Sequence, residues 1–342
     1  MRCSRETQIK AFLRAAGWEA AQRNPLPGDA SSRRYEKLSL NGSRAVLMDA
    51  PSGAPSGGYA DIAKLADGRM AAFTSICQAL TQRGFSAPKI ISADLEAGLL
   101  LTEDLGDDDV AQVLKDSPEL EREIYMAAMD TLGAIYRSSF LRAQPSFGSV
   151  WDIRDYDAAA MQAEVDLMAQ WYLPYKDVVL SPDQKLRWEE IWAGILESLT
   201  AHAPGLVLRD FHAQNIFWLP QRDATSKIGL IDFQDALMGH PAYDVVSLIE
   251  DARRDVGPAL AAPLIDQFCA AAKIQNDDSF AAAYAAIGAQ RNAKILGIFV
   301  RLARRDDKPA YLNLLPRVEA HFQNNLSHPV MADLRAFLKD LS

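Results

Sequence analysis

The chain has 342 residues, with 36 lysines and arginines against 45 aspartates and glutamates, which gives a formal net charge of −9. A hydrophobic share of 49% and a charged share of 24% are typical of a globular protein and exclude a largely disordered one. The length favours about two domains. The acidic balance argues against nucleic acid or an anionic membrane as partner, since both require a basic face.

The use of cysteine and histidine gives no sign of disulfides or structural zinc. The three cysteines and five histidines are scattered, with no Cys-x-x-Cys or Cys/His cluster. The first 18 residues lack the apolar stretch of a signal peptide and are typical of an amphipathic helix. The apolar run 281–289 is too short to cross a membrane. We expect a cytoplasmic monomer with no membrane partner.

Residues 26–105 contain short strand-like runs broken by turn-forming residues. Asn41-Gly42 favours a tight hairpin, because both residues tolerate positive φ. Apolar residues recur at helical spacing over 60–83, and Gly84 is suited to end that helix. Strands are expected over 34–40, 44–50, 89–93 and 98–102. The pattern predicts a small antiparallel sheet with one main helix, forming an N-terminal lobe over residues 1–105.

Beyond Asp109 the helical period dominates. Helices are expected over 118–142, 155–173, 182–202, 241–254, 258–272, 278–304, 308–325 and 329–340. Only 206–208, 216–219 and 227–231 are typical of short strands. The sequence therefore predicts an α+β protein whose larger, helical C-terminal lobe covers residues 106–342.

A polar loop and an acidic turn among those short strands carry the chemistry. Residues 207–219 read Val-Leu-Arg-Asp-Phe-His-Ala-Gln-Asn-Ile-Phe-Trp-Leu, and residues 228–235 read Ile-Gly-Leu-Ile-Asp-Phe-Gln-Asp. Asp210 and Asn215 lie on the loop, and Asp232 follows a strand. Phosphoryl transfer needs a carboxylate that orients the attacking hydroxyl and accepts its proton. It also needs an amide and a second carboxylate that hold Mg²⁺ against the phosphates.

This segment resembles the catalytic loop and metal-binding turn of protein-kinase-like enzymes. With His240-Pro-Ala-Tyr-Asp244 it is most similar to the aminoglycoside phosphotransferase family. The resemblance implies a bilobal protein-kinase-like fold that uses ATP and Mg²⁺. It implies Asp210 as the catalytic base, Asn215 and Asp232 as magnesium ligands, and Arg209 and Asp244 as residues that support the loop.

The N-terminal lobe departs from that pattern at the phosphate clamp. Met48 stands where the strand lysine is expected, and residues 60–83 contain no glutamate to pair with a lysine. The absence of both the lysine and the glutamate is consistent, because a buried charge that lacks its partner is unfavourable. Small residues and arginines in the turn 28–35 are typical either of a phosphate-covering hairpin or of a solvated turn with surface arginines. The expected nucleotide-binding residues are Ser31, Ser32, Arg33 and Arg34 in that turn, and Glu103 and Leu105 at the lobe junction.

Further segments extend the resemblance over nearly the whole chain, to bacterial kinases that phosphorylate the anomeric hydroxyl of N-acetylmuramate and N-acetylglucosamine. These segments are Val46-Leu-Met-Asp-Ala-Pro51, Thr102-Glu-Asp-Leu-Gly-Asp107, Leu296-Gly-Ile-Phe-Val-Arg-Leu302 and the run from Tyr311 to Arg317. The resemblance implies an ATP-dependent sugar 1-kinase of peptidoglycan recycling, with a small sugar as its partner. Two alternatives are a kinase of another hydroxyl acceptor, such as an aminoglycoside or choline, and a nucleotide-binding pseudokinase.

Candidate sugar contacts come from one predicted helix and from the loop. Asp157, Glu164 and Trp171 are seven residues apart, so we expect them along one helix face, where carboxylates and an aromatic ring suit a pyranose. The alternative is a core tryptophan with solvated acids. His212 is a further candidate, or a structural residue. Arg291 and Lys294 are either a pair for a lactyl carboxylate or solvated surface residues.

Overall fold

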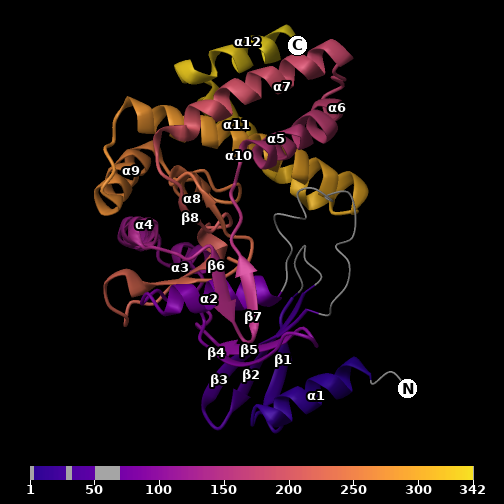
Figure 1. The fold of residues 1–342 in the computed structure, drawn as a ribbon, viewed down its shortest axis with the longest axis vertical. Coiled ribbons are helices and arrows are strands. Elements are labelled where there is room, and N and C mark those ends of the chain that lie inside the picture. Colours follow the sequence, from indigo (N-terminus) through magenta and orange to yellow (C-terminus); the bar gives the residue numbers. More distant parts are fainter. Residues whose placement is uncertain (1–3, 28–32, 51–69, 342) are drawn as a thin grey trace.

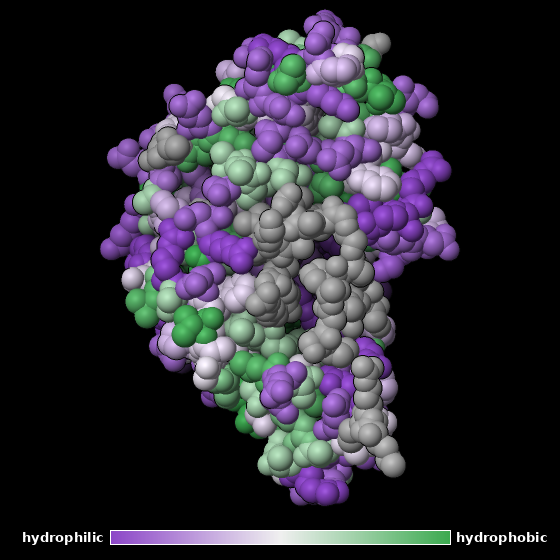
Figure 2. Space-filling model, turned by 45° about the vertical axis from the view of Figure 1, so that its right-hand side comes forward, coloured by the Kyte–Doolittle hydropathy of each residue, from purple (hydrophilic) through white to green (hydrophobic). Residues whose placement is uncertain are grey.

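The computed structural model describes residues 4–27, 33–50 and 70–341. Figure 1 shows a sheet with its helices at one end of the molecule and a larger helical part at the other. This arrangement confirms the bilobal α+β fold expected from the sequence. In the view of Figure 2 the molecule narrows from the helical part towards the sheet. Among the described helices, none has both the length and the apolar character needed to span a bilayer.

In the described part of the chain, five antiparallel strands form the sheet, in the order β1-β2-β3-β5-β4. The hairpin of β2 (Arg34–Leu40) and β3 (Ser43–Asp49) turns at Asn41 and Gly42, whose φ angles are 49° and 80°. Positive φ at both turn residues confirms the predicted hairpin, since this turn matches the twist of its strands. The other strands are β1 (Gln22–Pro25), β4 (Ile90–Asp94) and β5 (Leu99–Glu103).

Two helices cover opposite faces of this sheet, α1 (Arg5–Ala15) and α2 (Met70–Thr81). Side chains alternate along β3, so Leu47 packs with the apolar residues of α1 and Met48 with those of α2. The described helix α2 confirms the later part of the helix predicted over 60–83, and residues 60–69 lie outside the described residues. Met48 is therefore an apolar core residue on the face that carries α2.

Each helix predicted beyond Asp109 is present, most of them shorter than expected. The helices of this part are α3 (Val110–Asp116), α4 (Glu121–Arg137), α5 (Ala158–Leu167), α6 (Leu173–Tyr175), α7 (Pro182–Glu197), α8 (Ala242–Ile249), α9 (Pro258–Ala272), α10 (Asp278–Arg305), α11 (Leu315–Leu326) and α12 (Ala332–Asp340). The start of α7 shows why local sequence predicts a boundary well. Ser181 and Gln184 form a capping box there, and together they satisfy otherwise unpaired amides.

The residues from 70 to 341 also form three two-stranded sheets: β6 (Ala143–Ser146) with β7 (Ser149–Asp152), β8 (Gly205–Val207) with β11 (Leu237–Gly239), and β9 (Ile216–Trp218) with β10 (Ile228–Leu230). The hairpin of β6 and β7 was not predicted, and it packs against α2 (Figure 1). A segment from the predicted C-terminal lobe thus lies beside a helix of the N-terminal lobe. The division at residue 105 stays a prediction.

The long helix α10 packs closely against α5 and the π-helical turn Met168–Tyr172 that follows it. Gly297 allows this approach, because a Cβ atom there would lie 2.3 Å from the carbonyl carbon of Leu167. Gly194 in α7 is also helical, but a Cβ atom there would meet no atom within 4 Å. The two glycines therefore differ in the one property that decides whether alanine is tolerated.

We expect Gly297→Ala to lower the free energy of unfolding by about 1–3 kcal/mol or more, because overpacking forces two helices apart. Gly194→Ala is the matched control, and should raise it by about 0.5–1 kcal/mol through lower chain entropy in the unfolded state. Denaturant titration of both variants measures the difference. Equal stability of the two variants would contradict the close α10–α5 contact.

Candidate active site

The loop between β8 and β9 is held by a carboxylate from α8. Asp244 is 3% exposed, and its two oxygens accept the backbone N–H groups of Leu208 at 2.7 Å and Arg209 at 2.9 Å. Burial raises the pKa of Asp244 to about 7, while both amide donors lower it by favouring the charged form. This acceptor fixes the backbone directly before Asp210, as expected for a residue that supports the loop.

Two residues of the candidate site have left-handed backbone. Arg209 has φ of 73° and Asp232 has φ of 57°, in a conformation that non-glycine residues rarely adopt. Such residues cost on the order of 1–3 kcal/mol each and persist where surrounding contacts hold them. They cluster at functional sites for that reason, and here they stand on the two segments that carry the predicted chemistry.

The loop and the turn after β10 bring the predicted groups together. The side-chain nitrogen of Asn215 lies 3.4 Å from the Oδ2 atom of Asp232 and 3.0 Å from the carbonyl oxygen of Asp210. Gln234 donates to the Oδ1 atom of Asp232 at 2.8 Å. The ring of Phe233 stacks on Phe73 of α2 with centroids 5.1 Å apart. The acidic turn is therefore tied both to the loop and to the helix that covers the sheet.

The carboxylates of Asp210 and Asp232 lie close enough to repel each other. Burial, and then repulsion from Asp210, raise the pKa of Asp232 to about 6. A bound cation would relieve that repulsion. The described residues hold no group of three or more His, Cys, Asp and Glu side chains suited to a metal. Asp232 and Asn215 lie side by side through the Asn215 amide nitrogen, and both side chains carry oxygen, the ligand atom that Mg²⁺ takes. A set of two fits Mg²⁺ because it binds few protein ligands and takes phosphates and waters for the rest.

The two arginines of the predicted phosphate-covering turn lie in different places. Arg33 has a side chain 14% exposed and lies 3.3 Å from the Oδ1 atom of Asp232. Arg34 is 65% exposed and pairs with Asp49 at 2.6 Å. Arg33 is therefore the better placed of the two to contact phosphates. Ser31 and Ser32 lie outside the described residues.

The residues predicted beside adenine lie where the sheet meets the helical part. Glu103 pairs with Arg222 at 2.6 Å. Leu105 lies under β10, where a Cβ atom on Gly229 would come within 3.1 Å of its Cδ1 atom. The close contact explains why glycine stands at that position. Contact of Glu103 and Leu105 with a nucleotide stays a prediction.

The residues predicted to form a sugar-binding helix face do not share one. Asp157 precedes α5 and caps it, accepting the backbone N–H of Ala160 at 2.8 Å. Glu164 is fully buried, and its carboxylate pairs with Arg209. Trp171 is half-buried in the π-helical turn after α5 and packs against the core. A spacing of seven aligns side chains only in an unbroken α-helix, so the predicted face is wrong.

The basic pair on α10 is also divided. Arg291 is 6% exposed and donates to the hydroxyl of Ser247 at 2.8 Å. Lys294 pairs with Glu164 at 3.1 Å and donates to the Tyr243 hydroxyl at 3.3 Å. Both cations therefore bind groups of the protein interior. The sequence had suggested either a site for a substrate carboxylate or solvated side chains.

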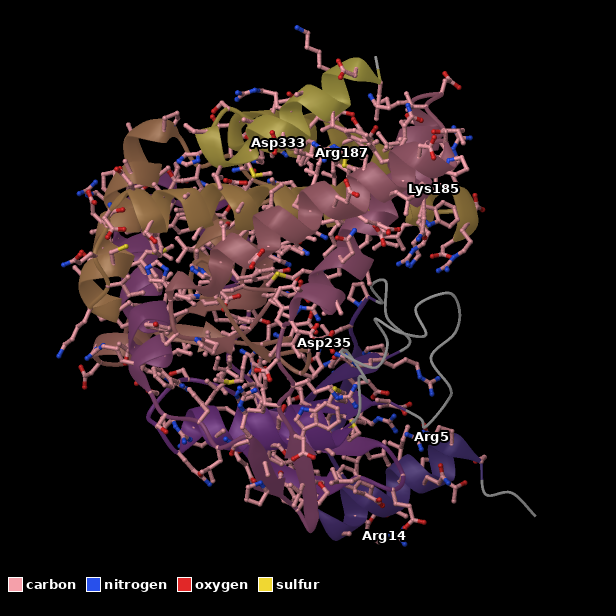
Figure 3. The ribbon with its side chains drawn as sticks, turned by 45° about the horizontal axis from the view of Figure 1, so that its top comes forward. Arg5, Arg14, Lys185, Arg187, Asp235 and Asp333 are labelled. Atoms are coloured by element: carbon pink, nitrogen blue, oxygen red, sulfur yellow. The ribbon has the colours of Figure 1, made fainter. Side chains whose placement is uncertain are left out.

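Two polar groups beside the loop have atoms without a partner among the described residues. His212 lies 3.2 Å from the Asn215 amide through Nε2, and burial lowers its pKa, but its Nδ1 atom has no partner. Asp235 has a buried Oδ1 atom in the same condition. Figure 3 shows Asp235 between the sheet and the helical part. Sequence reasoning missed Asp235, although it belongs to the quoted motif.

The fold and the site together define a phosphotransferase of the kinase-like class. The chain belongs to the phosphotransferase enzyme family, whose sequence pattern matches residues 22–284. An N-acetylmuramate/N-acetylglucosamine kinase of Caulobacter vibrioides is 37% identical over 347 residues, which cover 97% of this chain and 95% of that protein.

Solved structures show the same fold at low sequence identity. A choline/ethanolamine kinase family protein from Mesorhizobium loti is 14% identical, with a TM-score of 0.61 and coverage of 98% of this chain and 99% of that one. The ADP-bound aminoglycoside phosphotransferase APH(2'')-Ib is 15% identical, with a TM-score of 0.53 and coverage of 88% and 94%. These likenesses establish the fold class.

We expect Asp244→Ala to lower the free energy of unfolding by at least about 2 kcal/mol, because it leaves two buried amides without an acceptor. Asp255→Ala is the control: that side chain is 74% exposed and pairs with Arg317 on the surface, so its loss should cost less than about 1 kcal/mol. Thermal and denaturant unfolding measure both. A small effect at Asp244 would contradict its support of the loop.

Proposed function

We propose that this protein is an ATP- and Mg²⁺-dependent kinase that phosphorylates the anomeric hydroxyl of N-acetylmuramate or N-acetylglucosamine. The observation that carries the proposal is that the Asn215 amide lies beside both the Asp210 backbone and the Asp232 carboxylate, which brings the three predicted residues together. The similarity to a relative of that name over 97% of the chain supports the acceptor. The ADP in a neighbouring structure of this fold supports the nucleotide.

In this proposal Asp210 orients the anomeric hydroxyl and takes its proton. An anomeric hydroxyl is more acidic than an ordinary alcohol, so a positioned carboxylate suffices as base. Asn215 and Asp232 would hold Mg²⁺, which neutralises phosphate charge when it is bound. Arg33, 3.3 Å from Asp232, is placed to supply the positive charge that Met48 does not.

Two polar side-chain atoms near Asp210 lack a hydrogen-bond partner among the described residues. The Oδ1 atom of Asp235 and the Nδ1 atom of His212 are buried and have no partner among the described residues. Buried polar atoms are almost always hydrogen-bonded, so an unpaired pair beside Asp210 suits the hydroxyls of a bound sugar. The product, a sugar 1-phosphate, is the class of acceptor to which a uridylyl group is transferred from UTP, with release of pyrophosphate, to form a UDP-sugar, in keeping with a place in peptidoglycan recycling.

The position of the new phosphate tests the proposal directly. We expect turnover of N-acetylmuramate or N-acetylglucosamine with ATP, and none with the methyl glycosides, because blocking the anomeric oxygen removes the aligned nucleophile. Phosphorus NMR of the product should show coupling of the phosphate to the anomeric proton. Phosphate on the 6-hydroxyl, or turnover of an aminoglycoside or choline instead, would exclude the 1-kinase. No phosphoryl transfer to any acceptor would favour a pseudokinase.

Substitutions of the two neighbouring carboxylates, Asp210 and Asp232, should impair different steps. Asp210→Asn keeps the metal ligands but removes the base, so kcat should fall by about 10²–10⁴-fold with nucleotide affinity retained. Asp232→Ala removes a proposed metal ligand, so Mg²⁺-dependent nucleotide binding should be lost. Calorimetric titration of ATP with and without Mg²⁺, beside steady-state kinetics, separates the two. Normal turnover of Asp210→Asn, or unchanged Mg²⁺-ATP affinity of Asp232→Ala, would overturn the respective role.

A further inference from the structure

One buried carboxylate below the loop collects donors from several parts of the fold. Glu164 is 0% exposed. It accepts hydrogen bonds from the Tyr156 hydroxyl and the Arg209 guanidinium, and from Gln290 at 3.1 Å, and it pairs with Lys294 at 3.1 Å. Burial alone would raise the pKa of Glu164, but Lys294 and Arg209 lower it to about 2. The group is therefore a charged anchor with every donor supplied by the protein.

Through this anchor the side chain of Arg209 is held in addition to its backbone, by its Nη2 atom, while its buried Nε atom has no hydrogen-bond partner among the described residues. The guanidinium is 5% exposed and lies over the Tyr156 ring, its carbon 5.3 Å from the ring centroid. The backbone N–H donates to Asp244 at 2.9 Å, and the carbonyl accepts from Ser247 at 3.5 Å. Arg209 also carries the strained φ of 73° directly before Asp210. Any rotation of this residue would move the carboxylate that follows it.

We propose that Glu164 is a positioning residue for phosphoryl transfer: by holding Arg209, it fixes the backbone that presents Asp210 to the acceptor hydroxyl. The inference rests on the proposed role of Asp210 as base. It replaces the direct sugar contact expected from the sequence, because the buried carboxylate of Glu164 is already surrounded by protein donors.

The charges explain why the anchor must be an anion. Glu164 raises the pKa of both Arg209 and Lys294, which burial would otherwise lower. The two cations repel each other, and Arg209 acts against the charge on Lys294. Without the carboxylate between them they would separate, since a buried charge that loses its partner is strongly unfavourable. A neutral amide at position 164 would therefore free Arg209 to reorient.

The test is Glu164→Gln, which keeps the size of the side chain and removes its charge. We expect kcat to fall by about ten- to hundredfold, in line with the rate loss from misplacing a reacting group by about 1 Å. The KM values for ATP and for the acceptor should stay within about threefold of wild type. The comparison uses whichever acceptor the wild-type chain phosphorylates, so failure of the amino-sugar proposal would be seen separately.

Glu250→Gln is the matched control. Glu250 is 4% exposed and accepts from the neutral amides of Asn292 at 2.6 Å and Asn325 at 2.9 Å, so its hydrogen-bond partners lie on α10 and α11 and do not include Arg209. It should lower Tm as a buried substitution does, yet leave kcat within about twofold. If Glu164→Gln lowers Tm but not kcat, or if kcat falls equally in the control, the residue is only structural and the proposal is overturned.

A double-variant comparison tests whether the effect passes through Arg209. Arg209→Met and the double variant with Glu164→Gln should lose about the same kcat, because residues acting through one contact are not additive. Additive losses would overturn the proposal, as would a raised KM for the acceptor alone, which indicates direct sugar contact. Should Glu164→Gln not fold, Tyr156→Phe removes one donor to Glu164 and keeps the ring. It should lower kcat at least threefold with KM values unchanged, and wild-type kcat in that variant counts against the role.

Discussion

A left-handed backbone at Arg209 is the constraint on which the candidate site depends. A residue with a Cβ atom is strained in this conformation, so contacts elsewhere must hold it there. Asp244 takes its N–H, Ser247 donates to its carbonyl, and Glu164 binds its guanidinium. The strain is thus balanced by α8 on one side and α5 on the other. Because these helices belong to the core, the direction of the Asp210 side chain depends on the packing of the core as well as on the contacts within the loop.

The positions of the buried charges reflect the absence of a lysine at position 48 of the sheet. Met48 is 3% exposed and packs with α2, whose described residues contain no glutamate, so the sheet is apolar where related kinases bury an ion pair. Among the ion pairs of the described residues, the one that reaches the acidic turn is made by Arg33, which directly precedes β2 of the sheet. The helical part instead buries Arg209 and Lys294 with one carboxylate. Positive charge therefore stands on both sides of the proposed reaction centre.

The sequence predicted those features that depend on local patterns. The Asn41-Gly42 turn, the bounds of α9 and the strand–loop–strand context of Asp210 all rest on residues close together in the chain. β1 was not predicted, because Gln-Arg-Asn-Pro has no alternating apolar pattern. This segment is a strand because it pairs with β2 at the edge of the sheet, a contact that the local sequence does not indicate. The sugar-facing role of Glu164 was wrong for a related reason. Spacing places a carboxylate on a helix face, but only tertiary packing decides whether that face is buried.

The same packing links a small residue to the chemistry of the site. Gln290, Lys294 and Gly297 follow the spacing i, i+4 and i+7, so they share one face of α10. Gly297 brings that face against the carbonyl of Leu167, one turn beyond Glu164 on α5. At this distance Gln290 and Lys294 reach the Glu164 carboxylate, which in turn holds Arg209. A helix contact made possible by the absence of one Cβ atom thus sets the ion pairs that direct the loop. The geometry of Asp210 is in this sense a property of the α5–α10 interface.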